Sequence, residues 1–213
     1  MQKLRNILLT SCVAMAGILV SAGRGAAQPA TGGGEIRLIA QGDDMGVAHG
    51  FNVATIRAYK EGILRTANVI ITAGWAPEAA RFLKENPGLD AGVHLTLTSE
   101  WEGVKWRPLT LVPSLSDPFG YLFRAVQPRQ GQPGISVKEA NPSLTDVEKE
   151  LRAQIELAKK MIPHLSYMST HMTFRDLSPE VAALVQKLSK DTPVQISRLS
   201  NFGTLRTLNI TQP

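Results

Sequence analysis

The feature that most constrains the fold of this chain is the repeated alternation of short apolar runs with amphipathic, helix-like segments. Apolar runs that suit buried strands span residues 36–40, 67–72, 89–97, 165–169 and 194–197. Segments with helical spacing or helix start signals lie between them, at residues 51–61, 77–86, 145–161 and 178–188. Strands that alternate with helices of this length are typical of a parallel α/β architecture.

A long connection rich in proline and glycine, residues 98–142, interrupts the alternation. Loops of this length are usually functional or disordered. The helix behind it is predicted to begin with a capping box at Thr145 to Glu148. We predict a signal peptide at 1–27, a flexible leader at 28–35, one α/β domain at 36–199 and an irregular tail at 200–213.

The first residues have the pattern of a secretory signal peptide. Lys3 and Arg5 precede an apolar run over residues 7–20, and small residues follow as far as Ala27. The run is shorter than the roughly 20 residues that a membrane-spanning helix needs, which argues against an uncleaved anchor. The sequence therefore predicts a secreted or periplasmic protein with no stable membrane anchor after cleavage.

The composition argues against cysteine chemistry and against a nucleic-acid partner. The single cysteine, Cys12, lies within the predicted signal, so the mature chain has no disulfide, thiol nucleophile or cysteine-type metal site. The formal net charge is +5, but no dense Lys/Arg block is interleaved with aromatic residues. A nucleic-acid partner is therefore not indicated.

Metal-competent side chains fall at the ends of three predicted strands. Asp43 and Asp44 follow the first apolar run, His94 lies near the end of the third, and His171 follows the fourth. The carboxyl ends of parallel strands share one edge of the sheet, where such folds place their ligands. Each residue alone has an ordinary explanation as a turn, core or surface residue. Their shared position predicts that they converge.

One carboxylate and two imidazoles form a three-ligand set that leaves positions open for water and substrate. A cation there lowers the pKa of bound water and polarises a carbonyl oxygen. The second carboxylate of the Asp pair can then serve as general base. The same ligand set also suits a non-haem iron oxygenase, but those enzymes usually have jelly-roll barrels, which the strand–helix alternation does not suggest.

Four ordered segments resemble motifs of the YdjC-like carbohydrate deacetylases. Residues 38–46 are similar to the family's strand with "DDxG", and residues 62–68 to its entry into the second strand. Residues 91–98 resemble its "GxHxxLT" motif, and residues 167–172 its "HxxSHM" segment. The resemblance covers about residues 36–190.

The resemblance implies a TIM-like, incomplete (β/α) barrel that hydrolyses N-acetyl groups on amino sugars or oligosaccharides. Carried over by position, Asp44, His94 and His171 would hold one divalent metal ion, Mg or Zn, and Asp43 would be the catalytic base. Two imidazoles favour zinc over magnesium. An acetylated amino sugar or oligosaccharide is the expected partner, and a homodimer is compatible with this interpretation.

The sequence departs from the family pattern near its C-terminus. Family members usually carry a histidine in an "H-P-G"-like segment there, a candidate general acid, and no histidine follows His171. A full barrel needs about 250 residues, so the barrel is expected to be C-terminally shortened. Tyr167 also stands where some members have another histidine. The alternative is a degenerate, non-catalytic carbohydrate-binding domain that retains the metal site.

Four further residues are candidates for substrate contact. His49 lies close to the Asp pair, and Trp101, Trp106 and Arg107 lie in the long connection. The tryptophans suit stacking on a sugar ring. They suit equally well a hydrophobic clasp that holds the connection down, and His49 suits a solvated helix start.

Overall fold

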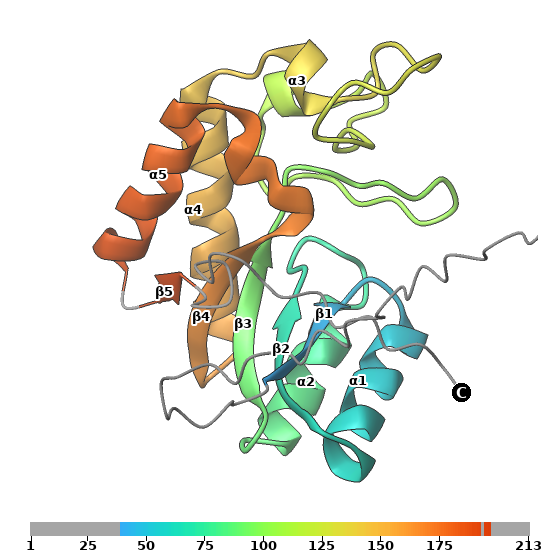
Figure 1. Cartoon of the computed structure of the whole chain (residues 1–213), viewed down its shortest axis with the longest axis vertical. Coiled ribbons are helices and arrows are strands. Elements are labelled where there is room, and N and C mark those ends of the chain that lie inside the picture. Colours follow the sequence, from blue (N-terminus) through green and yellow to red (C-terminus); the bar gives the residue numbers. More distant parts are fainter. Residues whose placement is uncertain (1–38, 193, 197–213) are drawn as a thin grey trace, which may run out of the picture. The chain divides into compact units, whose positions relative to one another are not determined.

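The computed structural model describes residues 39–192 and 194–196, which form an α/β fold around one parallel sheet (Figure 1). The strands are β1 (Ala40–Met45), β2 (Leu64–Val69), β3 (Asp90–Leu95), β4 (Leu165–Thr170) and β5 (Gln195–Ile196). The helices are α1 (His49–Glu61), α2 (Ala76–Glu85), α3 (Val137–Ala140), α4 (Leu144–Met161) and α5 (Pro179–Asp191), with short 3-10 segments η1 (Pro113–Leu115) and η2 (His171–Leu177). The predicted signal peptide, leader and tail (200–213) lie outside the described residues.

The five strands are hydrogen-bonded in the order β1-β2-β3-β4-β5, and every pair is parallel. This sequential order is that of a (β/α) barrel, in which each strand pairs with the next along the chain. The predicted α/β class with parallel strands is confirmed, and the sequential strand order is compatible with an incomplete barrel. A parallel sheet also differs from the jelly-roll barrels that non-haem iron oxygenases usually have.

The core lies where the helices pack on the sheet. Figure 1 shows α1 and α2 beside β1 and β2, and α4 and α5 beside the β3–β5 side of the sheet. Helix α4 is amphipathic and buries Val147, Leu151, Ile155 and Ala158, which lie three or four residues apart. Strand β3 is buried from Ala91 to Leu95, as expected for a central parallel strand covered on both faces. Among the described residues no helix combines the length and apolarity needed to cross a membrane.

Two predicted boundaries were wrong, and the first of them matters for the site. The first strand does not end at residue 40 but continues to Met45, so Asp43 and Asp44 belong to the strand and not to a loop. Backbone pairing with β2 extends the strand despite its polar side chains. Helix α4 is capped by Ser143, whose hydroxyl accepts a hydrogen bond from Asp146 N (3.1 Å), and not by Thr145.

The connection between β3 and α4 is anchored by a buried carboxylate on α4. Glu150 is fully buried and accepts hydrogen bonds from Leu109 N (2.9 Å), Thr110 N (3.0 Å) and Thr110 Oγ1 (2.7 Å). Gln154 Nε2 donates a fourth bond (2.9 Å) to the same carboxylate. One side chain therefore ties the middle of the connection to the helix.

Replacing Glu150 with alanine should destabilise the protein by at least about 3 kcal/mol, because four donors lose their acceptor and a buried donor without one costs roughly 1–3 kcal/mol. Urea unfolding would measure the loss. The control is Glu156→Ala on the same helix, where the side chain is 54% exposed and a change within about 0.5 kcal/mol is expected. Equal effects of the two substitutions would contradict the anchoring role.

Candidate metal centre

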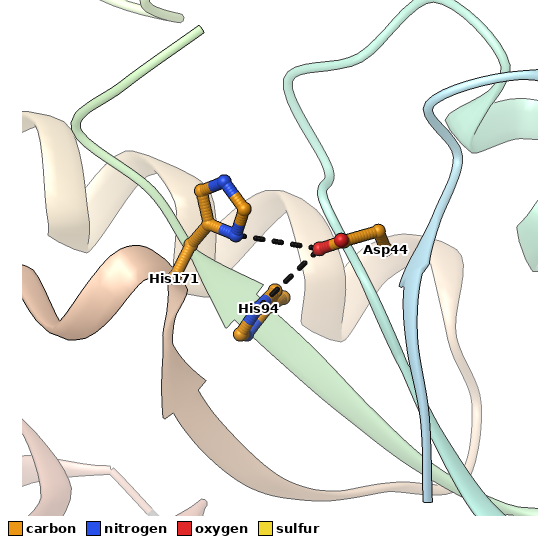
Figure 2. A group of neighbouring side chains, drawn as sticks. All are labelled: Asp44, His94 and His171. Carbon is orange, nitrogen blue, oxygen red and sulfur yellow. Dashed lines mark ion pairs between the residues drawn. The ribbon is translucent and has the colours of Figure 1, made fainter. Parts of the chain in front are cut away.

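Three ligand-competent side chains meet at the carboxyl ends of β1, β3 and β4 (Figure 2). Asp44 Oδ1 lies 3.5 Å from His94 Nε2 and 3.3 Å from His171 Nδ1. The three ligand atoms all lie within 4.8 Å of one another. Residues far apart in sequence thus converge at the sheet edge where the strand-end pattern had placed them.

A β-bulge directs the Asp44 side chain toward the two imidazoles. Gly42 pairs with Ala67 and Met45 with Val69, so β1 has one residue more than β2 over this stretch. Asp44 lies in the bulge with φ 66°, in the left-handed region. Bulges re-aim side chains and recur beside active sites. Here the bulge separates the directions of the two adjacent carboxylates.

Unusual backbone conformations also follow β4. Met172 (φ 49°) and Thr173 (φ 53°) are left-handed immediately after His171. Such residues cost on the order of 1–3 kcal/mol each and cluster at functional sites, where the surrounding structure enforces them. Thr98, past the end of β3, donates a hydrogen bond to Met172 Sδ (3.5 Å), which links the two strand ends.

Each imidazole presents one nitrogen to Asp44 and the other to a hydrogen-bonding partner. His94 Nδ1 lies 2.7 Å from Ser169 Oγ, and His171 Nε2 lies 3.1 Å from Glu100 Oε2. Histidines that bind metals almost always engage their second nitrogen in this way, which fixes the ring orientation. Sequence reasoning missed Glu100 as part of the site; its position just past the end of β3 was the available signal.

Asn68, at the end of β2, connects the two aspartates to the rest of the site. Its fully buried amide donates to Asp43 Oδ1 (2.8 Å) and to Ser169 Oγ (2.9 Å). Its oxygen accepts from Asp44 N (3.2 Å). Sequence reasoning missed this residue too, although an asparagine within an apolar run is a recognisable signal. With Asn68, four successive strand ends contribute to one polar cluster.

The donor set suits a divalent cation. Asp44 Oδ1 is buried and makes no hydrogen bond to the described part of the chain, although two ring nitrogens face it. Leaving a buried carboxylate oxygen unpaired is costly. A cation bound by these three groups would satisfy it, and one carboxylate with two imidazoles is a common ligand combination for zinc.

The local environment shifts the pKa values of the two imidazoles in opposite directions. Burial lowers the pKa of His94, as does the positive charge of His171, to about 4. Burial would also lower the pKa of His171, but Asp44 and Glu100 outweigh it and raise that pKa to about 9. Burial would raise the pKa of Asp44, yet the neighbouring imidazoles hold it below its usual value. In the metal-free protein at neutral pH, His171 therefore carries the proton.

These shifts predict that the pair of imidazoles makes the metal-free protein most stable near pH 6.5. The His171 pKa rises from 6.5 to about 9 on folding, so its stabilisation is complete below pH 6.5 and is lost as the pH rises toward 9. The His94 pKa falls from 6.5 to about 4, so stability is also lost as the pH falls from 6.5 toward 4.

Thermal unfolding of chelator-treated protein between pH 5 and 9 would check this dependence. The His171→Gln variant should lose the decline on the alkaline side and keep a smaller decline on the acidic side, because burial alone then lowers the His94 pKa without the positive charge of His171. An alkaline decline of the same size in that variant would contradict the assignment to His171.

The four predicted substrate-contact residues have different environments. Trp106 is 3% exposed and donates from Nε1 to Thr98 O (2.9 Å), which is the environment of a hydrophobic clasp, and a sugar contact from this residue stays a prediction. Trp101 is half-buried, with its ring 5.3 Å from that of Phe51. Arg107 lies over the Tyr121 ring (4.4 Å) and donates to Phe119 O. It is thus engaged within the connection.

His49 is the first residue of α1 and lies outside the three-ligand cluster. Its side chain is 57% exposed, and its Nδ1 is 3.0 Å from Glu78 Oε1. Its ring lies 5.4 Å from that of Trp75, which is 45% exposed. The solvated helix start describes this environment. A substrate contact from this exposed position stays a prediction.

Comparison with known proteins finds that this chain is similar to proteins named carbohydrate deacetylases. Carbohydrate deacetylase 1 of Listeria innocua is 27% identical over 175 residues, which cover 81% of this chain and 66% of that protein. A carbohydrate deacetylase of Thermus thermophilus is 32% identical over 161 residues, covering 74% and 52% respectively. This chain therefore spans less than two thirds of the length of these relatives.

A solved structure shares the fold. The protein from Enterococcus faecalis, described as a cellobiose-phosphate cleavage protein, superimposes with a TM-score of 0.61 at 25% identity. The match covers 72% of this chain and 55% of that one. The model of the family described as YdjC-like protein matches residues 37–211. Because the family model matches most of the length of this chain, the chain belongs to the YdjC-like protein family.

Proposed function

We propose that the protein is a metal-dependent carbohydrate deacetylase that hydrolyses N-acetyl groups on amino sugars or oligosaccharides. The observation that carries the proposal is the buried Asp44 Oδ1, which makes no hydrogen bond to the described residues and faces imidazole nitrogens from two other strand ends at ion-pair distance. The relatives named carbohydrate deacetylases support the substrate class and reaction.

Asp44, His94 and His171 would hold the cation. When bound, a divalent cation supplies Lewis acidity, which polarises the acetamide carbonyl and acidifies water. The two imidazoles favour zinc, and magnesium is the alternative that the family resemblance includes. The Ser169 and Glu100 contacts hold the two rings with Nε2 and Nδ1, respectively, toward Asp44.

Asp43 is the proposed general base. Gln41 Nε2 (2.6 Å) and Asn68 Nδ2 (2.8 Å) both donate to Oδ1, which orients the carboxylate. Both hydrogen bonds from described residues go to Oδ1, so Oδ2 remains available as a proton acceptor. Asp43 takes a proton from water as the oxygen attacks the acetamide carbon. Hydrolysis breaks the C–N bond, and that proton must end on the departing amine, giving acetate and a free amino sugar.

An acetate-release assay tests the proposal. The purified protein would be incubated with chito-oligosaccharides and other N-acetylated amino sugars, before and after removal of metal with a chelator. We expect acetate from at least one substrate, its loss with the chelator, and recovery on adding zinc or magnesium. Sugar binding with cation bound, but no acetate from a broad panel, would instead support the non-catalytic carbohydrate-binding alternative.

Cellular location and assembly stay predictions from the sequence. Export to the periplasm or the medium is proposed from the basic and apolar pattern of residues 1–27. The N-terminal sequence of the protein recovered from each cell fraction would test it. A homodimer is equally a prediction, which light scattering would test.

A further inference from the structure

Glu100 contacts the metal centre from outside the three ligands. It lies on the β3–α4 connection, five residues beyond the last residue of β3. Its Oε2 is 3.1 Å from His171 Nε2, the ring nitrogen that faces away from Asp44. The Glu100 and His171 side chains are 19% and 7% exposed, so solvent competes little for this hydrogen bond.

The start of the connection holds Glu100 in this place. Ser99 N donates to Phe123 O (2.7 Å), and Arg124 Nε donates to Glu100 O (3.4 Å). The buried Trp106 donates from its backbone to Ser99 Oγ (3.0 Å). The backbone on both sides of the Glu100 side chain is therefore fixed by contacts with later residues of the same connection.

The two imidazoles differ in what holds them. The partner of His94 is Ser169 Oγ, a neutral hydroxyl on the adjacent strand. The partner of His171 is a carboxylate that can only accept a hydrogen bond when ionised. In the neutral ring that a cation binds, an acceptor at Nε2 holds the proton on that nitrogen and leaves the Nδ1 lone pair free. It also opposes a flip of the ring that would exchange the two nitrogens.

We propose that Glu100 is a positioning residue of the metal centre, which holds the His171 imidazole with Nδ1 directed to the cation. The β3–α4 connection is thereby a structural part of the cation site. This inference rests on the proposed metal site, and it is independent of whether the bound cation supports deacetylation.

Zinc affinity, measured by competition with a chromophoric chelator, tests the proposal without an activity assay. Glu100→Ala should lower the affinity about 10- to 100-fold, the range typical for loss of such an outer partner. Glu100→Gln should keep most of the affinity, because its amide oxygen accepts the same hydrogen bond. Glu61→Ala is the matched control: its side chain on α1 is 65% exposed and pairs with Arg57, and it should leave affinity unchanged.

Imidazole 15N NMR of the zinc-loaded proteins separates positioning from a general loss of structure. The wild-type and Glu100→Gln proteins should show His171 bound through Nδ1 with the proton on Nε2. Glu100→Ala should lose this single state while the His94 signals persist.

Unchanged zinc affinity and an unchanged His171 spectrum in Glu100→Ala would overturn the inference, and the deacetylase proposal would stand. Zinc binding that depends on Glu100, together with no acetate release, would overturn the deacetylase proposal and leave this inference standing.

Discussion

Replacing Asp43 with asparagine is expected to lower acetate release by about 100- to 10,000-fold, the contribution of a positioned general base, while the cation stays bound. Asparagine keeps an oxygen that can accept from Asn68 and Gln41, so the local structure should persist. It cannot take a proton from water. Steady-state kcat with the best substrate, together with metal content of the same preparation, measures both halves of the expectation.

The control for that substitution is Asp176→Asn. Asp176 lies on η2 beyond His171, and its side chain is 69% exposed. Its replacement removes one exposed carboxylate that is not part of the three-ligand cluster and should leave kcat within about twofold, as expected for a surface substitution. Wild-type kcat in Asp43→Asn would exclude Asp43 as the base. Loss of the cation in Asp43→Asn would reassign it to the ligand set.

Replacing either His94 or His171 with alanine is expected to remove the bound cation and, with it, all measurable acetate release. Three protein ligands leave no redundancy, because each supplies one of the few strong bonds to the metal. The two remaining ligands would be one carboxylate and one imidazole, too few to retain zinc through purification. Elemental analysis of the purified variants, with and without added zinc, provides the measurement.

The other two histidines of the chain are the natural controls for these variants. His49 is exposed at the start of α1, and His164 contacts Leu89 O (3.1 Å) through Nε2. Neither belongs to the three-ligand cluster, so His49→Ala and His164→Ala should keep the full metal content. A stoichiometric cation in His94→Ala or His171→Ala would show that the metal is held elsewhere.

Much of the fold could be predicted because the apolar periodicity is strong. The alternation of strand and helix gave the parallel α/β class, and helices such as α2 lie within one residue of their predicted bounds. In parallel α/β folds, ligand-binding side chains gather at the carboxyl ends of the strands. That rule was enough to predict the cluster of Asp44, His94 and His171. No long-range contact had to be known for that step.

The details that shape the site could not be predicted from periodicity. The bulge at Asp43–Asp44 depends on register between β1 and β2, which is set by tertiary packing. Glu100 lies in a connection without periodicity, so its contact with His171 depends on how that connection folds back. Trp106 illustrates the same limit. A tryptophan in this connection suited sugar stacking and a hydrophobic clasp equally well, and only the packing of the fold shows that its side chain is buried.

The most direct test of the central claim is anomalous X-ray scattering at the zinc edge from crystals of the zinc-loaded protein. We expect one strong peak at about 2.0–2.2 Å from Asp44 Oδ1, His94 Nε2 and His171 Nδ1. A zinc peak bound by other residues, with none among these three atoms, would contradict it.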